Sequence, residues 1–314
     1  MNHVVVSAML PVMALIVLGL GVGRLGWLGS QAVRRLSMVS FMVLTPVLLF
    51  RAMSKVHVEQ LDLRPAMVYT LTLALVFAGI VRLQGLNPRA AVLALAATYA
   101  NAVMIGIPLI QLAFGDAGLV TLFTLIPVHS LLLLTTATVL IEFAFAREHA
   151  ASNPEVVSRL WRVGSLAVRR ALIHPVPLPI VAGLVFAQTG WTITPWLDVP
   201  MFWLSQAFGP LALFLVGVSL AGSTVGAHLR GALMMVGVKN LLVPLLAGAL
   251  GHAFGMSGLP LVVMVITAAL PVGINAFLFA QRYGVVQETI TASVAVSTVV
   301  TAVTVSLILL VAGR

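Results

Sequence analysis

The sequence predicts an all-α polytopic membrane protein with ten transmembrane helices. We expect these helices to form two inverted five-helix repeats, in which helices 4 and 9 are broken and cross each other. Three observations support this fold class. The 314-residue chain is 61% hydrophobic and 8% charged, whereas soluble domains carry about 25% charged residues. Ten apolar runs are long enough to cross the ~30 Å of bilayer hydrocarbon, and short motifs of the first half recur in the second.

Five apolar runs precede the long polar segment of the chain, and five follow it. A helix crosses a bilayer with about 17 to 25 mostly apolar residues. The first five candidates are residues 3–23, 36–54, 66–83, 90–113 and 117–146. The second five are residues 172–189, 201–222, 230–254, 258–282 and 286–311. No Lys or Arg precedes the first run, so we expect a retained span rather than a cleaved signal peptide.

The polar segment divides the chain into three parts. These are a first five-helix repeat (residues 1–146), a cytoplasmic connector (147–171) and a second, inverted five-helix repeat (172–314). The motif LPV at residues 10–12 returns as LPI at 178–180, and GW at 26–27 returns at 190–191, with a nearly constant offset. Such recurrence indicates a duplication. Because each repeat has an odd number of spans, the second must be inverted in the membrane.

Basic residues indicate the orientation, because cytoplasmic loops are enriched in Lys and Arg. One side of the predicted topology holds twelve of them, namely Arg24, Arg34, Arg35, Arg82, Arg89, Arg147, Arg159, Arg162, Arg169, Arg170, Arg230 and Arg282. The other side holds Arg51, Lys55, Arg64 and Arg314, and we interpret Arg51 as an interfacial anchor. We therefore expect a multi-pass protein of the inner (cytoplasmic) membrane with both termini on the non-cytoplasmic side. The connector could bind anionic lipid or a partner, but we favour a solvated linker that fixes the topology.

The composition excludes several classes of function. The chain has no cysteine, so it cannot form disulfides, thiolate metal sites or a cysteine nucleophile. Its formal net charge of +9 lies in short loops between apolar runs, where cytoplasmic retention explains it better than nucleic-acid binding. No catalytic or nucleotide-binding motif stands in a context where it would work. We therefore expect no enzyme, no cofactor and no metal site.

Two of the apolar runs, residues 93–115 and 265–284, are interrupted near the middle. The interrupting residues are Asn101, Gly106, Pro108, Pro271, Gly273 and Asn275. Proline removes a backbone donor and glycine weakens a helix, while lipid offers no partner to the freed backbone groups. Interrupted segments at corresponding places in two halves of a membrane chain predict the binding site of a transporter.

The breaks themselves favour an anionic ligand. If they cross, two half-helix ends with positive partial charge converge near the middle of the membrane, and such ends bind anions. We therefore expect the six interrupting residues to form the substrate site. The amides of Asn101 and Asn275 could hold a carboxylate or cap the broken helices, and both roles stay open.

Two further polar residues lie inside apolar runs. A buried ammonium must face protein, water or an anion, so Lys239 joins the substrate-binding candidates; snorkelling to the cytoplasmic surface is the alternative. His129 titrates near neutral pH and could serve proton coupling, although a lone histidine in a bundle is often a neutral core residue. No acidic residue lies clearly at mid-membrane, and Glu142 is the nearest. This argues against an ordinary cation antiporter.

The two broken segments, YANAVMIGIPLIQLAFG and LPVGINAFLFAQRYG, resemble those of the auxin efflux carrier family in its bacterial branch. The resemblance covers nearly the whole chain, and its matching positions are Pro46, Phe50, Arg51, Lys239, Pro271, Asn275, Gln281 and Gly284. It implies a scaffold of helices 1, 2, 6 and 7 that mediates dimerisation. It also implies a transport domain of helices 3–5 and 8–10, crossing at Pro108 and Pro271, that moves like an elevator and carries small organic anions. Bacterial members are usually called malonate or malate permeases.

The sequence therefore predicts a secondary transporter that moves small organic anions, carboxylates in particular, by alternating access. One alternative is a sodium- or proton-coupled transporter of the same fold, and another is a membrane receptor that binds its ligand without transport. The expected partners are the anionic substrate, the lipid bilayer and a second copy of the chain in a homodimer. Substrate identity, transport direction and the coupling ion stay open.

Overall fold

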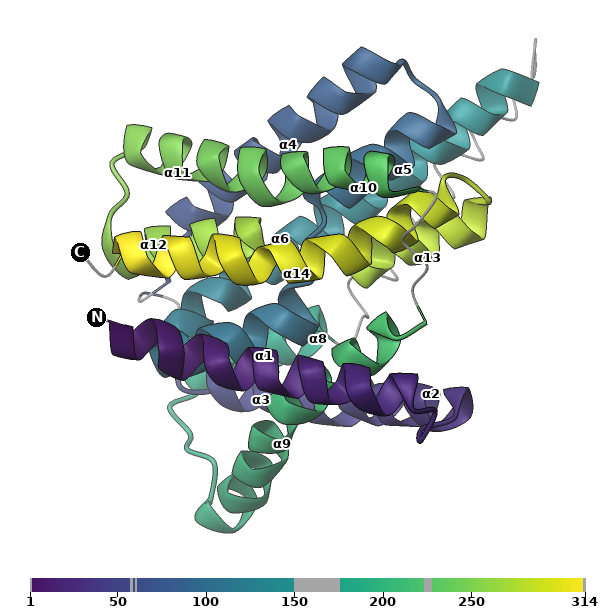
Figure 1. The fold of residues 1–314 in the computed structure, drawn as a ribbon. Coiled ribbons are helices and arrows are strands. Elements are labelled where there is room, and N and C mark those ends of the chain that lie inside the picture. Colours follow the sequence, from purple (N-terminus) through teal and green to yellow (C-terminus); the bar gives the residue numbers. More distant parts are fainter. Residues whose placement is uncertain (1, 57–58, 60, 150–175, 223–227, 313–314) are drawn as a thin grey trace.

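The computed structural model describes residues 2–56, 59, 61–149, 176–222 and 228–312. Regular structure in these ranges is helical (Figure 1). Six helical segments are long and apolar enough to cross a membrane, namely Ser30–Met53, Arg64–Gln84, Ala102–Phe145, Pro195–Leu220, Leu229–Ala253 and Gln287–Ala312. One shorter apolar helix, Met9–Arg24, precedes them, and three others lie between them: Pro88–Thr98, Pro177–Gln188 and Gly258–Ala269. The fold is therefore all-α and consistent with a polytopic membrane protein, while its arrangement as a ten-helix inverted repeat stays a prediction.

The helices of the first half follow the predicted apolar runs. They are α1 (Asn2–Arg24), α2 (Ser30–Val39), the π-helical turn η1 (Ser40–Leu44), α3 (Thr45–Met53), α4 (Arg64–Gln84), α5 (Pro88–Thr98), the π-helical turn η3 (Ala102–Gly106) and α6 (Ile107–His149). α6 joins the predicted runs 90–113 and 117–146, and it changes direction at Gly115, where φ is 60° and ψ is −153°. Glycine enters this conformation at little steric cost, so the two runs meet at a kink.

The second half follows its predicted runs in the same way. Its elements are α8 (Pro177–Gln188), α9 (Pro195–Leu220), α10 (Leu229–Val236), the π-helical turn η5 (Gly237–Leu242), α11 (Val243–Ala253), α12 (Gly258–Ala269), α13 (Ile274–Tyr283) and α14 (Gln287–Ala312). α9 begins before the predicted run 201–222, because Pro195 occupies its first turn, where a missing N–H is tolerated. Most of the predicted connector, residues 150–171, lies outside the described residues.

The helices pack as two groups that lie one above the other in Figure 1. The lower group contains α1, α2, α3, α8 and α9, and the upper group contains α4, α5 and α10 to α14; α6 contacts helices of both. Within the lower group α1 lies directly along α9. A Cβ atom added at Gly19 or Gly217 would fall 2.0 Å from a backbone oxygen of the other helix. Only glycine permits this approach, so α1 and α9 form a tightly packed contact, which we call the α1–α9 seam.

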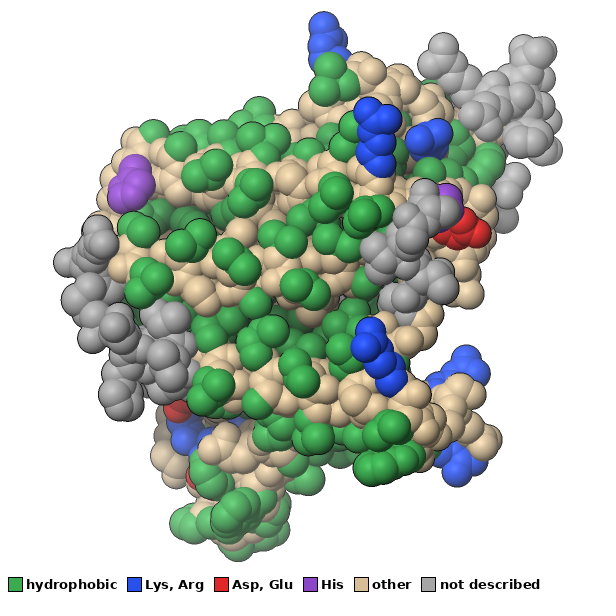
Figure 2. Space-filling model, in the orientation of Figure 1, with side chains coloured by type: hydrophobic (Ala, Val, Ile, Leu, Met, Phe, Trp, Pro, Cys, Tyr) green, Lys and Arg blue, Asp and Glu red, His purple; other side chains and the backbone are tan. Residues whose placement is uncertain are grey.

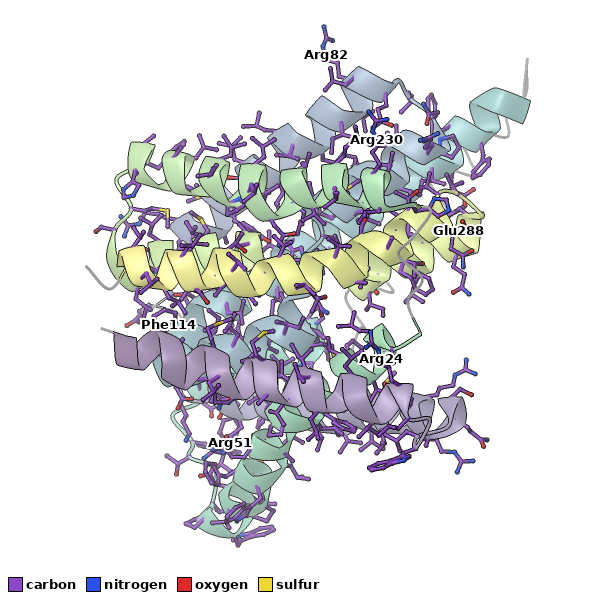
Figure 3. The ribbon with its side chains drawn as sticks, in the orientation of Figure 1. Arg24, Arg51, Arg82, Phe114, Arg230 and Glu288 are labelled. Carbon is purple, nitrogen blue, oxygen red and sulfur yellow. The ribbon has the colours of Figure 1, made fainter. Side chains whose placement is uncertain are left out.

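The two ends of the molecule differ in charge. The N- and C-termini lie at the same end (Figure 1). On the face shown in Figure 2, apolar side chains cover the middle, and most Lys and Arg side chains gather at the opposite end. Arg24 and Arg230 lie toward that opposite end, whereas Arg51 lies toward the termini (Figure 3). This distribution agrees with the predicted sidedness, but the membrane orientation stays a prediction.

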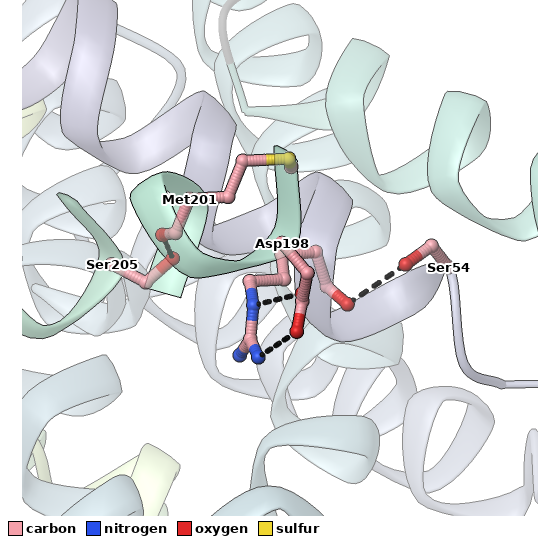
Figure 4. A network of polar contacts seen from close by, with 5 residues as sticks. Ser54, Asp198, Met201 and Ser205 are labelled. Carbon is pink, nitrogen blue, oxygen red and sulfur yellow. Dashed lines mark hydrogen bonds and ion pairs between the residues drawn. The ribbon is translucent and has the colours of Figure 1, made fainter. Parts of the chain in front are cut away.

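Arg51 connects two helices of the lower group. Its Nε donates to Oδ1 of Asp198 at 2.7 Å and its Nη2 to Oδ2 at 2.9 Å, so the ion pair joins α3 to α9 in a bidentate manner (Figure 4). The guanidinium also lies 5.1 Å from the ring centroid of Phe202, and the hydroxyl of Ser54 donates to the Arg51 carbonyl at 2.9 Å. The sequence interpretation of Arg51 as an interfacial anchor therefore misses its main partner within the protein.

Candidate functional site

The two predicted breaks exist, and they meet. α5 ends at Thr98 before η3 begins at Ala102, and α12 ends at Ala269 before α13 begins at Ile274. Between these ends the chains pair as an isolated antiparallel bridge. The Asn101 N–H donates to the Pro271 carbonyl at 2.9 Å, and the Gly273 N–H donates to the Tyr99 carbonyl at 2.8 Å. Each break thus supplies partners for backbone groups that the other one frees.

The glycines of the two breaks are buried, and each lies close to a residue of the other break. A Cβ atom at Gly273 would fall 2.5 Å from Cδ1 of Tyr99 and 3.0 Å from the Ala100 carbonyl oxygen. A Cβ atom at Gly106 would fall 2.7 Å from Cδ1 of Leu270. Pro108 and Pro271 are likewise buried. Gly106 and Gly273 therefore determine how closely the two breaks approach. Pro271 contributes its carbonyl to the bridge, whereas Pro108 lies in α6, with its Cβ atom 3.3 Å from the position of a Cβ atom added at Gly209 of α9.

Polar side chains from other elements donate hydrogen bonds to the last carbonyl groups of α12. The ammonium Nζ of Lys239 donates to the Ala268 carbonyl at 2.6 Å. The amide Nδ2 of Asn240 donates to the Ala269 carbonyl at 2.9 Å, and the Thr301 hydroxyl donates to the same carbonyl at 3.1 Å. Lys239 and Asn240 are fully buried in the turn η5. Lys239 therefore does not snorkel to the surface.

The amino ends of the helices that follow the two breaks, η3 and α13, lack such side-chain partners. η3 follows Asn101 and α13 follows Gly273, and neither cap residue bonds the first turn through its side chain. The first N–H groups of a helix lack intrahelical partners and carry positive partial charge. Asn101 is partly exposed, and its side chain makes no hydrogen bond within the described part of the chain. The crossing thus presents two uncapped positive ends.

A chain of neutral polar groups connects the two breaks. Nδ2 of Asn275 donates to the Tyr99 hydroxyl at 2.7 Å, which lies 3.1 Å from the Ser130 hydroxyl. The ring of His129 is packed against that of Tyr99, with 4.7 Å between centroids. Asn275 is partly exposed, whereas His129 is only 2% exposed, and in the described part of the chain neither of its ring nitrogens has a hydrogen-bond partner. The structure thus brings Asn275 and His129 together around Tyr99.

Sequence reasoning missed Tyr99. It is one of three tyrosines in the chain and stands two residues before Asn101 in an apolar run. A tyrosine buried in a membrane span needs a partner for its hydroxyl, and this was the available signal. Its two partners, however, are far away in sequence.

A cavity of about 800 Å³ lies beside this chain, between α4 and α6. Its lining is mostly apolar, with the polar residues Thr70, His129 and Thr136 along it and Arg82 among the residues toward the end of α4. Tyr69, which precedes Thr70, packs its ring against His129 at 5.9 Å and has no partner for its hydroxyl. Within the described residues, no group of three or more His, Asp or Glu side chains could hold a metal ion.

Comparison with known proteins shows the family to which the chain belongs. The family model described as "Membrane transport protein" matches residues 4–309. The chain belongs to this family. The match confirms the predicted kinship with auxin efflux carriers, because the relatives of this membrane transport protein include one of them.

Two relatives show the breadth of the family. The chain is 28% identical over 312 residues to a protein of Rhizobium meliloti (strain 1021) named "Putative malonate transporter", a match that covers 96% of this chain and 94% of the relative. It is 23% identical over 231 residues to "Auxin efflux carrier component 8" of Arabidopsis thaliana, a match that covers 62% of this chain and 63% of the relative. Membership in a membrane transport family, together with several apolar helices, makes this a multi-pass membrane protein.

Proposed function

We propose that the protein is a secondary transporter that moves small organic anions, carboxylates in particular, across the cytoplasmic membrane by alternating access. The observation that carries the proposal is the pair of uncapped helix amino ends at one crossing. Anions bind at such ends, and transporters with broken helices use them for anionic groups of their substrates. The relative named as a malonate transporter supports the same substrate class.

In this proposal the residues of the crossing have distinct roles. The partly exposed amides of Asn101 and Asn275 bind the carboxylate directly, because an amide N–H₂ donates two hydrogen bonds. Gly106, Pro108, Pro271 and Gly273 hold the backbone so that the N–H groups that follow face the anion. Lys239 makes no contact with it and contributes long-range attraction from behind α12.

Transport needs movement of the site relative to the rest of the protein. The upper group of helices contains both breaks, and the lower group contains the tightly packed α1–α9 seam. We therefore assign the upper group, with α6, as the moving transport domain and the lower group as the scaffold. The scaffold would also form the homodimer, with both termini on the non-cytoplasmic side.

A second candidate is a proton-coupled carrier of the same architecture. It is favoured by one observation: His129 lies against Tyr99, lines the cavity between α4 and α6, and has no hydrogen-bond partner for either nitrogen within the residues that the structure describes. Replacement His129→Gln would remove the pH dependence of substrate uptake in proteoliposomes if this candidate is correct. Unchanged pH dependence would contradict it.

The decisive experiment is thermal unfolding of the purified protein with a panel of small organic acids and their uncharged amides. A ligand of the folded state raises the melting temperature, so we expect stabilisation by an acid and not by its amide. The variant Asn275→Ala should stay folded and lose most of this shift. Gln188→Ala, which changes an exposed amide on α8, is the matched control and should retain it.

Two results would contradict the proposal. Equal stabilisation by acids and amides would remove the anion site, and an unchanged shift in Asn275→Ala would remove Asn275 from it. Countertransport of the stabilising acid in vesicles then separates a transporter from a receptor, because a receptor without two-sided access cannot exchange its ligand across the membrane.

A further inference from the structure

The carbonyl end of α12 has the chemistry of a cation site. The last carbonyl groups of a helix lack intrahelical donors and carry negative partial charge. In transporters with broken helices, such ends and the unwound carbonyls beside them bind a coupling sodium ion. Four oxygens belong to this end or to side chains bonded to it: the carbonyls of Ala268 and Ala269, the Thr301 hydroxyl, and the side-chain oxygen of Asn240. Three hydrogen bonds of 2.7 to 3.1 Å connect the Asn240 amide nitrogen, the Thr301 hydroxyl and the Ala269 carbonyl.

Lys239 brings a positive charge to this place. Its side chain is fully buried, and its ammonium lies 2.6 Å from the Ala268 carbonyl oxygen. Within the described residues it forms no ion pair with a carboxylate. A buried ammonium needs compensation, and the partial negative charge of the helix end is the compensation that the structure provides.

Asn240 gives a second, independent indication. Its amide nitrogen is used twice, by the Ala269 carbonyl and by the Thr301 hydroxyl. Its side-chain oxygen is buried and has no hydrogen-bond partner among the described residues. A buried acceptor without a donor is destabilising by about 1–3 kcal/mol. This oxygen belongs to the same amide group whose nitrogen donates to the Ala269 carbonyl, one residue from Lys239, and it is a ligand that a cation could use.

We propose that the ammonium of Lys239 is a tethered cation that takes the place of a coupling sodium ion at the carbonyl end of α12. The inference rests on the proposed transport function and deepens it: the carrier moves its anion without sodium, because the positive charge that this helix end requires is part of the chain. Within the described part of the chain Lys239 has no carboxylate partner, which agrees with a fixed cation that is not exchanged during transport.

The proposal predicts that removing the ammonium converts the end of α12 into a sodium site. In Lys239→Ala the oxygens stay in place and the side-chain volume becomes free. We expect sodium chloride to raise the melting temperature of this variant, whereas N-methylglucamine chloride at the same ionic strength does not. Acid countertransport should fall by about tenfold without sodium, the effect of a lost charge-assisted hydrogen bond, and recover with sodium.

Three comparisons make the test specific. Wild type should melt at the same temperature in both salts. Lys239→Met, which removes the charge but fills the space, should be impaired and insensitive to sodium. Lys55→Ala, which changes the one other lysine of the sequence, an exposed one, should behave as wild type.

Two results overturn the inference: sodium stabilisation of wild type, or a folded Lys239→Ala that does not respond to sodium. If Lys239→Ala is recovered in sodium alone, the proposal is supported. If folded Lys239→Ala protein is obtained in neither salt, the test rests on the melting temperature of the wild type in the two salts. Equal melting temperatures support the proposal. The melting measurements require no substrate, so they stay informative even if no acid of the panel binds and the proposed function fails.

Discussion

The two broken spans meet in one bridge, but they are held in different ways. At the first break the end of α5 is bonded by its own helix: the Thr98 hydroxyl donates to the Ala94 carbonyl at 2.7 Å, and the Tyr99 N–H donates to the Leu95 carbonyl at 2.7 Å. At the second break α12 has the equivalent local bond, from the Thr267 hydroxyl to the Val263 carbonyl at 2.7 Å. Its last carbonyls are bonded in addition by side chains of η5 and α14, among them Lys239 and Thr301.

This difference shows where tertiary structure is needed. Apart from the bridge itself, the hydrogen bonds described at the end of α5 are local, and its surroundings are aromatic and polar: the Tyr99 hydroxyl, with His129 and Ser130 beside it. The second break depends on partners that lie far away in sequence, including a charged one. If the halves arose by duplication, charge compensation was acquired by one copy alone. The two breaks should therefore respond unequally to substitution.

The largest effect is expected where the breaks touch. In Gly273→Ala the new methyl group would lie 2.5 Å from Cδ1 of Tyr99 and 3.0 Å from a backbone oxygen, so the bridge must open. Overpacking of this kind destabilises by about 1–3 kcal/mol or more, and we expect a large fall in melting temperature together with loss of acid binding. Gly106→Ala should be milder, because its near neighbour is the end of the flexible Leu270 side chain.

Gly79→Ala is the control for both, since a Cβ atom at Gly79 would meet nothing within 4 Å. A Gly273→Ala protein as stable as Gly79→Ala would show that the two breaks do not cross as described.

Substitutions at the carbonyl ends of α5 and α12 should have an intermediate effect on stability, and the loss should be larger at α12. Asn240→Ala removes the hydrogen bonds to the Ala269 carbonyl and the Thr301 hydroxyl, and we expect a loss of about 2 kcal/mol in the free energy of unfolding. Thr98→Val removes local bonds of α5 and should be destabilising by about 1 kcal/mol or less. Reversible unfolding in detergent measures both. If Thr98→Val proved equally harmful, the local and distant modes of stabilisation would not differ.

The smallest effect is expected in the neutral chain around Tyr99. Ser130→Ala removes the 3.1 Å contact with the Tyr99 hydroxyl, which keeps its 2.7 Å bond from Asn275. We expect a change below about 1 kcal/mol in the free energy of unfolding and a nearly unchanged acid response. Tyr99→Phe removes both contacts and should be the more severe variant. The reverse order would mean that Ser130 has a role of its own.

Much of the helical plan could be predicted from the sequence, because length and hydrophobicity alone decide which segments suit a bilayer. The two breaks could also be located, since Pro271 and Gly273 act on their own backbone. The kink at Gly115 was not predicted as such: it joins two runs that the sequence treats as separate. A glycine between two apolar runs does not reveal whether the helix ends or merely bends.

The contacts at the site could be predicted only in part. The sequence identified Lys239 as a buried charge but offered no means of finding the Ala268 carbonyl, because that partner is brought close by the packing of η5 against α12. The same holds for Asp198 beside Arg51 and for Tyr99 beside Asn275. Each pair is distant in sequence, and single-sequence patterns describe only near neighbours along the chain.

The bridge between Ala100 and Val272 also matters for how the protein is made. More than half the length of the chain separates the two residues. During synthesis the first broken span enters the bilayer long before its partner exists, and lipid cannot satisfy the backbone groups that the break exposes. A nascent chain must therefore shelter this segment, against the membrane insertion machinery or its own earlier helices, until the second half arrives. Assembly of the crossing is then a late step, and the interval before it is when this protein is most exposed to misfolding and quality control.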